Sequence, residues 1–136
     1  MNKRRLMFRG ASLLMIAASG ACASSHHSGP MILDVGELAE RSGELDGQVV
    51  TVRGWIEIDP ETFRLWETAS AMERGKDEEQ CVGISVPKGI DRKTFDRTQV
   101  IVHGQYVSDV SGRFVVLGGC RSGRFLILSS VESVTP

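Results

Sequence analysis

Hydrophobic and polar residues alternate through residues 48–58, and this period of two constrains the fold more than any other feature of the sequence. Every second position is an aliphatic residue or a glycine, namely Val50, Val52, Gly54, Ile56 and Ile58. Successive side chains of a strand point to opposite faces of a sheet. The segment therefore predicts a strand with one aliphatic face and one mixed face.

Further segments extend this sheet. The sequence Asp59-Pro60-Glu61 has turn chemistry, and the alternation resumes over 62–66 as a hairpin partner. Similar alternation predicts a third strand over 82–86, a fourth over 100–106 and a last one over 125–131. Glycines bracket one more short apolar piece, Phe114 to Leu117.

Three segments favour helix or loop. Asp34 followed by Glu37 is typical of a helix start, and we expect a short helix there that ends at Gly43. Residues 67–80 are charged, which predicts a mobile loop or a short exposed helix outside the core. Residues 88–97 are polar with one Phe, and predict a turn of helix over the barrel end.

Two glycines, Gly54 and Gly104, fall in the middle of predicted strands, where a strand must bend sharply. Five short strands leave edges exposed unless the sheet curls shut. The order of a hairpin, a third strand, a short helical connection and two more strands is that of the OB fold. We therefore expect an all-β fold, a five-stranded OB-like barrel with a short N-terminal helix.

A family resemblance agrees with this expectation. The segments 45–56, 99–106 and 125–132 resemble recurring pieces of small exported bacterial OB-fold proteins related to the tRNA-anticodon-binding type. The likeness covers residues 32–134. Its motifs are hydrophobic alternation with a glycine, so the resemblance implies a fold and brings no catalytic residues with it.

The N-terminus has the pattern of a secretory signal. Four basic residues, Lys3, Arg4, Arg5 and Arg9, precede a short apolar stretch and then small residues. The apolar stretch is too short to span a bilayer comfortably. We divide the chain into a signal peptide over 1–21, a flexible tether over 22–31 and an OB-fold domain over 32–136.

The signal ends in Ser19-Gly20-Ala21-Cys22, which resembles a lipobox. In lipoproteins the peptidase cuts before a cysteine that already carries diacylglycerol, so the resemblance implies lipidation of Cys22 and a membrane anchor. Ser19 stands where Leu is usual, which leaves an ordinary cut near Ala21 or Ala23 open. With the lipid, we expect an exported cell-envelope protein, anchored to the membrane and facing the periplasm or the outside.

The chain has three cysteines, and free thiols are unusual in an oxidising compartment. If Cys22 carries lipid, Cys81 and Cys120 remain as a disulfide pair. The alternative is that both are buried and unpaired.

Charge argues against a nucleic-acid partner. Removing the four leader bases from 16 basic residues leaves 12 against 17 acidic ones, a net charge of about −5 after Cys22. Nucleic-acid binding depends on a basic surface that neutralises phosphates, and this composition lacks one.

The mixed strand faces supply the candidate ligand-binding residues. Parity places Arg53 and Trp55 of one strand beside Arg64 and Trp66 of its hairpin partner. Exposed tryptophans flanked by arginines would suit stacking on a planar or sugar ring. The alternative is that one or both tryptophans close a barrel end or pack beneath the charged loop.

Catalytic and metal-binding signals are missing from the sequence. His103 is the only histidine of the domain, and a lone histidine on a strand is more often structural than a ligand. We therefore expect a non-enzymatic envelope lipoprotein, without cofactor or metal, whose OB-fold domain binds an envelope protein or a glycan. Alternatives are a domain that binds single-stranded nucleic acid or oligosaccharide, and an enzyme or a metal or haem carrier.

Overall fold

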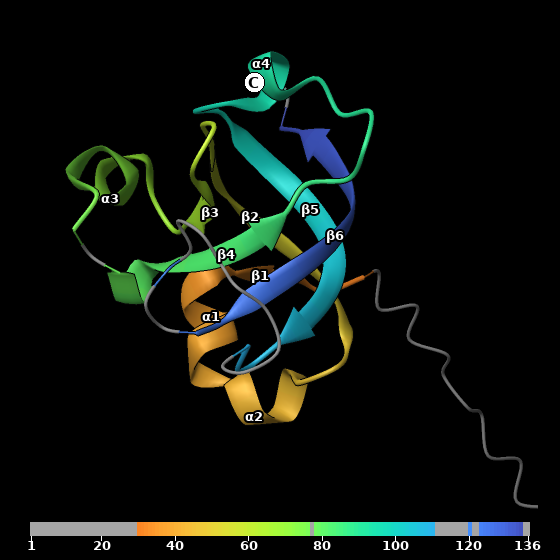
Figure 1. The fold of residues 1–136 in the computed structure, drawn as a ribbon. Helices are drawn as coiled ribbons and strands as arrows, with labels where there is room; N and C mark the ends of the chain where they lie inside the picture. Colours follow the sequence, from red (N-terminus) through yellow and green to blue (C-terminus); the bar gives the residue numbers. More distant parts are fainter. Residues whose placement is uncertain (1–29, 77, 111–119, 121–122, 135–136) are drawn as a thin grey trace, which may run out of the picture.

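A computed structural model of the chain describes residues 30–76, 78–110, 120 and 123–134 (Figure 1). The signal peptide, Cys22, most of the tether and the apolar piece at 114–117 lie outside the described residues. Within the described residues, no helix is long and apolar enough to cross a membrane.

Five strands form a closed barrel. They are β2 (Val49–Ile58), β3 (Phe63–Trp66), β4 (Cys81–Ser85), β5 (Gln99–Val107) and β6 (Phe125–Ser133). Their order is β2-β3-β4-β6-β5, and β5 pairs back onto β2, which closes the sheet. Only the β4–β6 pairing is parallel among these five. This arrangement confirms the predicted five-stranded OB-like barrel.

A sixth strand, β1 (Ile32–Asp34), was not predicted. It runs parallel to β2, and Leu33 lies opposite Val52. Three residues are too few to show a period of two, so the sequence pattern did not identify this strand. β1 adds Leu33 to the core at the point where the chain enters the barrel.

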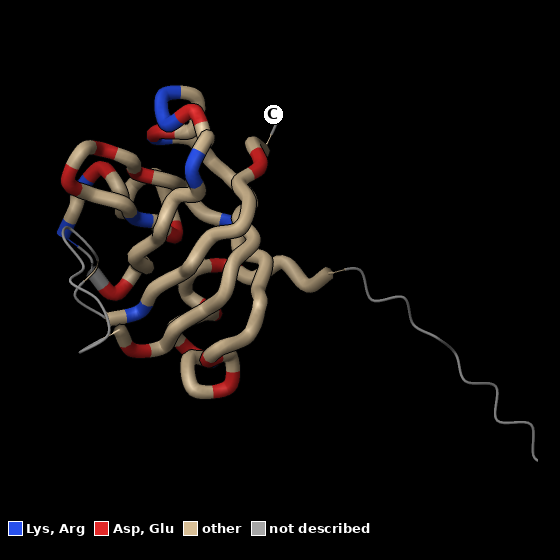
Figure 2. The backbone as a smooth tube through the Cα atoms, turned by 45° about the vertical axis from the view of Figure 1, so that its right-hand side comes forward, with Lys and Arg blue, Asp and Glu red and all other residues tan. Residues whose placement is uncertain are grey.

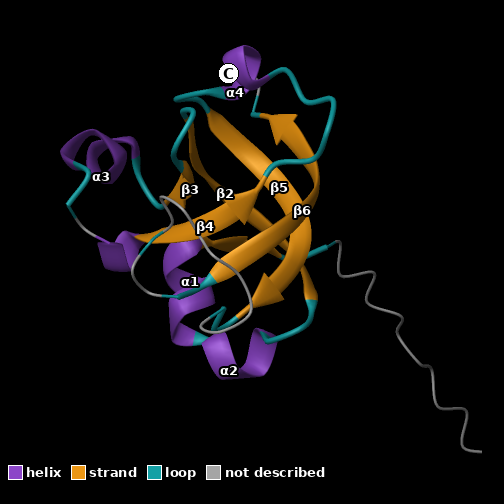
Figure 3. Ribbon diagram, viewed as in Figure 1, coloured by secondary structure: helices purple, strands orange, loops and turns teal. Residues whose placement is uncertain are grey.

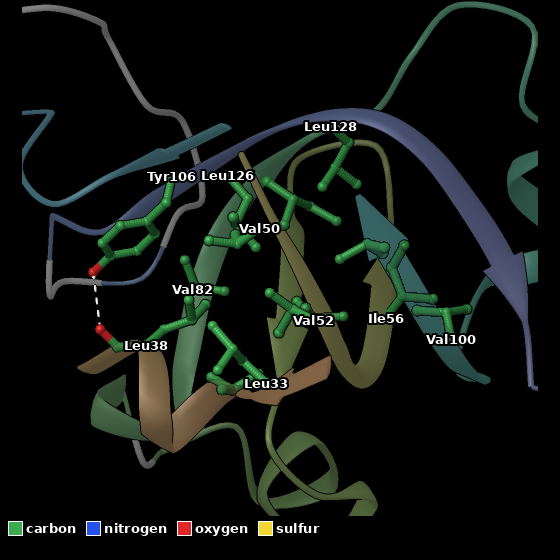
Figure 4. Close-up of a cluster of buried hydrophobic side chains, with 14 of the residues drawn as sticks. Leu33, Leu38, Val50, Val52, Ile56, Val82, Val100, Tyr106, Leu126 and Leu128 are labelled. Atoms are coloured by element: carbon green, nitrogen blue, oxygen red, sulfur yellow. Dashed lines mark hydrogen bonds between the residues drawn. The ribbon is translucent and has the colours of Figure 1, made fainter. Parts of the chain in front are cut away.

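The barrel interior is filled by aliphatic side chains from alternate positions of every strand. Figure 4 shows Leu33 of β1 and Leu38 of the first helix packed against these strand residues. The buried cluster consists of Leu33, Val35, Leu38, Leu45, Val50, Val52, Ile56, Ile58, Leu65, Val82, Ile84, Val100, Val102, Tyr106, Leu126 and Leu128.

Gly54 and Gly104 lie where neighbouring strands come very close. A Cβ at Gly54 would be 2.7 Å from Leu65 Cγ and 2.8 Å from the Trp66 carbonyl oxygen. A Cβ at Gly104 would be 2.6 Å from the Ile127 carbonyl oxygen, beside an irregularity in the β5–β6 register. The two positions therefore need glycine for close backbone approach, as expected in a small, strongly curved barrel.

Two short helices, α1 (Val35–Glu40) and α2 (Ser42–Leu45), cover one end of the barrel (Figure 3). The backbone N–H of Asp34 donates to Glu37 Oε2 at 2.7 Å, as the predicted helix start requires. The prediction that the helix stops at Gly43 was wrong, because Gly43 lies inside α2. Its Cβ position faces open space and its φ is not positive, so glycine does not end the helix there.

The tyrosine of β5 connects the barrel to both helices. Tyr106 is fully buried, and its hydroxyl lies 2.8 Å from Ser42 Oγ and donates to the Leu38 carbonyl oxygen at 3.3 Å. Figure 4 shows the hydrogen bond to Leu38. The helices are thus held to the strands by polar as well as apolar contacts.

Two further helices interrupt the strand connections. α4 (Arg92–Phe95) lies at the barrel end opposite α1 and α2, as predicted (Figure 3). α3 (Ala69–Arg74) and the 3₁₀ helix η1 (Glu78–Gln80) connect β3 to β4. The expectation that residues 67–80 stay outside any core was wrong, because Ala71 and Met72 are buried.

Candidate functional site

The four predicted ligand-binding residues share the outer face of the first hairpin. Trp55 of β2 lies directly opposite Trp66 of β3, and Glu57 lies opposite Arg64. Arg53 comes two positions before Trp55 on β2, so its side chain leaves the same face. The structure thus places these residues together, as the parity of the two strands predicted.

Trp66 is not exposed on that face. Its relative solvent exposure is 0%, and it packs in a cluster with Ala71, Met72, Cys81 and Cys120. The hypothesis of an exposed pair of tryptophans is therefore wrong for Trp66. The alternative considered from the sequence, a tryptophan beneath the charged loop, describes its position.

A disulfide completes this cluster. Cys81 of β4 is bonded to Cys120, with 6.0 Å between the two Cα atoms. The bond joins residues 39 positions apart and lies against Trp66. The predicted Cys81–Cys120 pair is therefore present, and it helps to cover the outer side of β3 and β4.

Glu57 is the polar centre of the face. Its Oε2 accepts the Trp66 indole N–H at 2.9 Å, and the side chain of Glu57 is only 15% exposed. Arg64 and Arg97 each place a guanidinium nitrogen 4.0 Å from a Glu57 carboxylate oxygen. One carboxylate therefore satisfies a buried indole and partly offsets two cations.

The accessible part of the face lies along β2. Arg53 is exposed and Trp55 is half-buried at the rim of the Trp66 cluster. Arg64 lies over the Trp66 ring, with 5.8 Å between its Cζ atom and the ring centroid. A partner that approaches this face would therefore meet Arg53 and Trp55 first, and Arg64 at its edge.

Arg97 belongs to this face and was missed by the sequence analysis. It has a positive φ of 58°, and its backbone N–H donates to the Ile56 carbonyl oxygen at 2.8 Å. That bond brings the end of the α4 segment onto β2, beside Glu57. A non-glycine residue in the left-handed region leaves no clear mark in sequence, so its position depends on the fold.

The turn beside this face is ordered by Asp59. Asp59 Oδ1 accepts the backbone N–H of Glu61 at 2.9 Å. This hydrogen bond lowers the pKa of Asp59 below its usual value, and hydrogen bonds from Thr62 have a smaller effect in the same direction. The carboxylate thus fixes the hairpin that aligns Trp55 with Trp66.

His103 lies farther along the outer side of β2, opposite Thr51. Its Nδ1 is 2.8 Å from Thr51 Oγ1, and its Nε2 is 3.4 Å from Glu132 Oε1. The three side chains form a polar row across β2, β5 and β6. No group of three potential metal-ligating side chains was found among the described residues.

The chain matches no protein-family model. Nor does it match any curated protein.

Several solved structures are similar to part of this chain. One is asparaginyl-tRNA synthetase from Pyrococcus horikoshii, with 22% identity and a TM-score of 0.40 over 68% of this chain. Another is described as "a putative aspartyl-tRNA synthetase from Leishmania major Friedlin", with 13% identity and a TM-score of 0.46 over 84% of this chain. The alignments span 21% and 22% of those proteins.

Proposed function

We propose that this protein is an exported envelope lipoprotein, anchored through Cys22, whose OB-fold domain binds an envelope protein or a glycan without catalysing a reaction. The contact surface is the outer face of β2 around Arg53 and Trp55. The observation that carries the proposal is that these two side chains share one accessible face of a closed barrel. They lie beside the buried Trp66 cluster and its Cys81–Cys120 disulfide.

The burial of the Trp66 cluster is the reason that we propose a contact on β2. OB folds commonly bind oligonucleotides or oligosaccharides on the face of their second and third strands. In this barrel those strands are β3 and β4, and their outer face holds Trp66 and the disulfide beneath α3. The half-buried Trp55 is the aromatic side chain at the rim of that cluster, where a partner can reach it.

The arrangement of charge supports a protein or a glycan over a nucleic acid. Figure 2 shows basic and acidic residues interspersed along the described backbone, without a continuous basic stripe there. On the proposed face, Glu57 lies between Arg64 and Arg97 and offsets part of their charge. A polyanion gains affinity from clustered, uncompensated cations.

The anchor is tested by processing. Export in the producing bacterium with and without globomycin, together with the Cys22→Ser variant, reports whether a lipoprotein peptidase acts on the chain. With globomycin or with Cys22→Ser, we expect the unprocessed precursor to accumulate. We expect the mature protein to be lost from the membrane fraction. Unchanged processing and fractionation would contradict the lipid anchor.

The contact face is tested by crosslinked capture from intact envelopes. Trp55→Ala and Arg53→Ala should each reduce recovery of a specific protein or glycan relative to the wild type. Lys93→Ala removes an exposed cation from α4, outside this face, and serves as the matched control. Equal recovery of every partner with all variants would contradict the proposed face, and capture of nucleic acid instead would contradict the proposed ligand class.

A further inference from the structure

Four large hydrophobic side chains are exposed in the described part of the chain, and they gather on one side of the barrel. Their relative exposures are 78% for Val49, 60% for Met31, 41% for Ile32 and 39% for Ile127. Contiguous exposed apolar surface is more informative than scattered apolar residues, because it commonly marks a contact with a protein or a membrane.

The strand register places them together. Val49 lies opposite Gln105 of β5, and Gln105 lies opposite Ile127 of β6. The next row places Ile32 of β1 opposite Thr51 of β2. Each of the three strand residues is followed by a buried one, namely Leu33, Val50 and Leu128, so the exposed three point outward.

A hollow adjoins this surface. It has a volume of about 260 Å³ and lies between β1, α2 and the start of β2. Met31 and Val49 border it, and the apolar side chains of Leu33, Leu45 and Val50 form much of its wall. The exposed apolar surface is thus broken by a depression rather than flat.

The outward positions of these rows carry no carboxylate. They are Ile32, Thr51 and His103 in one row and Val49, Gln105 and Ile127 in the other. The charged neighbours are Arg41, which lines the hollow, Arg53 on β2, and Glu132 beside His103. A mainly apolar surface without a carboxylate at its outward positions approaches an anionic bilayer without the repulsion that the acidic body of the protein would otherwise meet.

We propose that this surface, formed by Met31, Ile32, Val49 and Ile127, rests on the phospholipid bilayer in which the protein is anchored. The inference rests on the proposed lipid anchor at Cys22. Seven residues separate Cys22 from Pro30. A fully extended chain from one to the other spans less than about 30 Å. The anchor therefore holds Pro30 within about 30 Å of the membrane.

The chain enters the barrel at this same surface. Figure 1 shows that β1 is the first strand of the described chain, and the register places its Ile32 opposite Thr51, two residues from Val49. Among the described residues, the exposed large hydrophobic side chains thus lie on the side from which the chain leads back to Cys22. A short tether that ends at exposed apolar residues favours the bilayer as the occupant over a separate protein partner.

This orientation leaves the proposed contact face free. Trp55 is six residues from Val49 along β2, which corresponds to about 20 Å at the rise of a β-strand. Contact of the Val49 end with lipid directs the Trp55 end away from the membrane. The two surfaces lie on one barrel and do not compete.

Photocrosslinking in intact envelopes tests the inference on the full chain. Benzoylphenylalanine is incorporated in place of Val49, in place of Ile127 and, as the control, in place of Glu61. All three positions are accessible, and Glu61 lies in the turn beyond the far end of β2. We expect a phospholipid adduct, identified by mass, at positions 49 and 127 and its loss at position 61.

The same samples separate the possible failures. Mass analysis of the N-terminal peptide reports whether Cys22 carries diacylglycerol. With Cys22 lipidated, a protein adduct at position 49, including a second copy of this chain, or equal lipid labelling at position 61 would overturn the membrane contact and leave the anchor intact. An unmodified Cys22 would overturn the anchor and the inference together.

Discussion

The indole nitrogen of Trp66 donates a 2.9 Å hydrogen bond to Glu57 across the first hairpin, although the two residues are not register partners. Trp66 lies opposite Trp55, and Glu57 lies opposite Arg64. The bond is therefore diagonal, and it lets a fully buried indole N–H find an acceptor at the edge of its cluster. A buried donor without an acceptor is costly, so this carboxylate stabilises the face above it.

Removal of the Glu57 carboxylate should destabilise the protein. Glu57→Ala leaves the Trp66 N–H buried without an acceptor, and we expect the free energy of unfolding to fall by about 1–3 kcal/mol. Glu57→Gln retains an acceptor oxygen and should cost less. Denaturant titration measures both, with Glu61→Ala as an exposed control. Equal stability of Glu57→Ala and the control would contradict the role of the bond.

Gly43 of α2 and Gly54 of β2 should respond in opposite directions to substitution by alanine. Gly54→Ala places a Cβ within 2.8 Å of Leu65 and the Trp66 backbone, and should destabilise the fold by about 1–3 kcal/mol. Gly43→Ala meets nothing within 4 Å and lies in α2, so it should be neutral or stabilise by about 0.5–1 kcal/mol. Thermal and denaturant unfolding distinguish them, and similar losses at both positions would contradict the close approach at Gly54.

The Tyr106 hydroxyl should contribute to the docking of α1 and α2. Tyr106→Phe keeps the buried ring and removes the bonds to Ser42 and Leu38, so we expect a loss of about 0.5–1.5 kcal/mol. Ser42→Ala removes one of those bonds, and the double variant should cost less than the sum of the two singles. Hydrogen exchange of α1 amides should rise in Tyr106→Phe. Strict additivity would show that the two hydroxyls do not interact.

Loss of the disulfide should destabilise the domain and uncover Trp66. A loop of 39 residues corresponds to about 4 kcal/mol in the chain-entropy model. The Cys81→Ser/Cys120→Ser variant should unfold at lower denaturant concentration, and the fluorescence of Trp66 should shift toward that of a solvated indole before global unfolding. Reduction of the wild type should reproduce both effects. Identical denaturation of oxidised and reduced protein would contradict this contribution.

The barrel was predictable because its strands alternate strictly. Val50, Val52, Ile56 and Ile58 all point inward, and only a curled sheet buries them without leaving edges. Gly54 was recognisable as a bend for the same reason, since it interrupts that aliphatic face. These are local signals that tertiary structure did not override.

The candidate site was only partly predictable. Parity placed Trp55 and Trp66 on one face, but it cannot tell which of the two is covered by a distant segment. Trp66 is buried because α3, capped by Thr68 and Gly75, folds back over β3. The charged residues around α3 predict an exposed segment. Two apolar residues, Ala71 and Met72, are too few to predict the contact with Trp66 from the sequence.

β2 pairs with β1, β3 and β5, so a change in its length would be transmitted to half of the sheet. Deletion of one residue near Val52 would exchange inside and outside for everything that follows, turning Trp55 and Glu57 inward and Ile56 toward solvent. The turn at 59–62 has no such constraint. Among homologues of this protein, insertions and deletions are therefore expected in that turn. The length of β2 should stay at ten residues even where its residues are substituted.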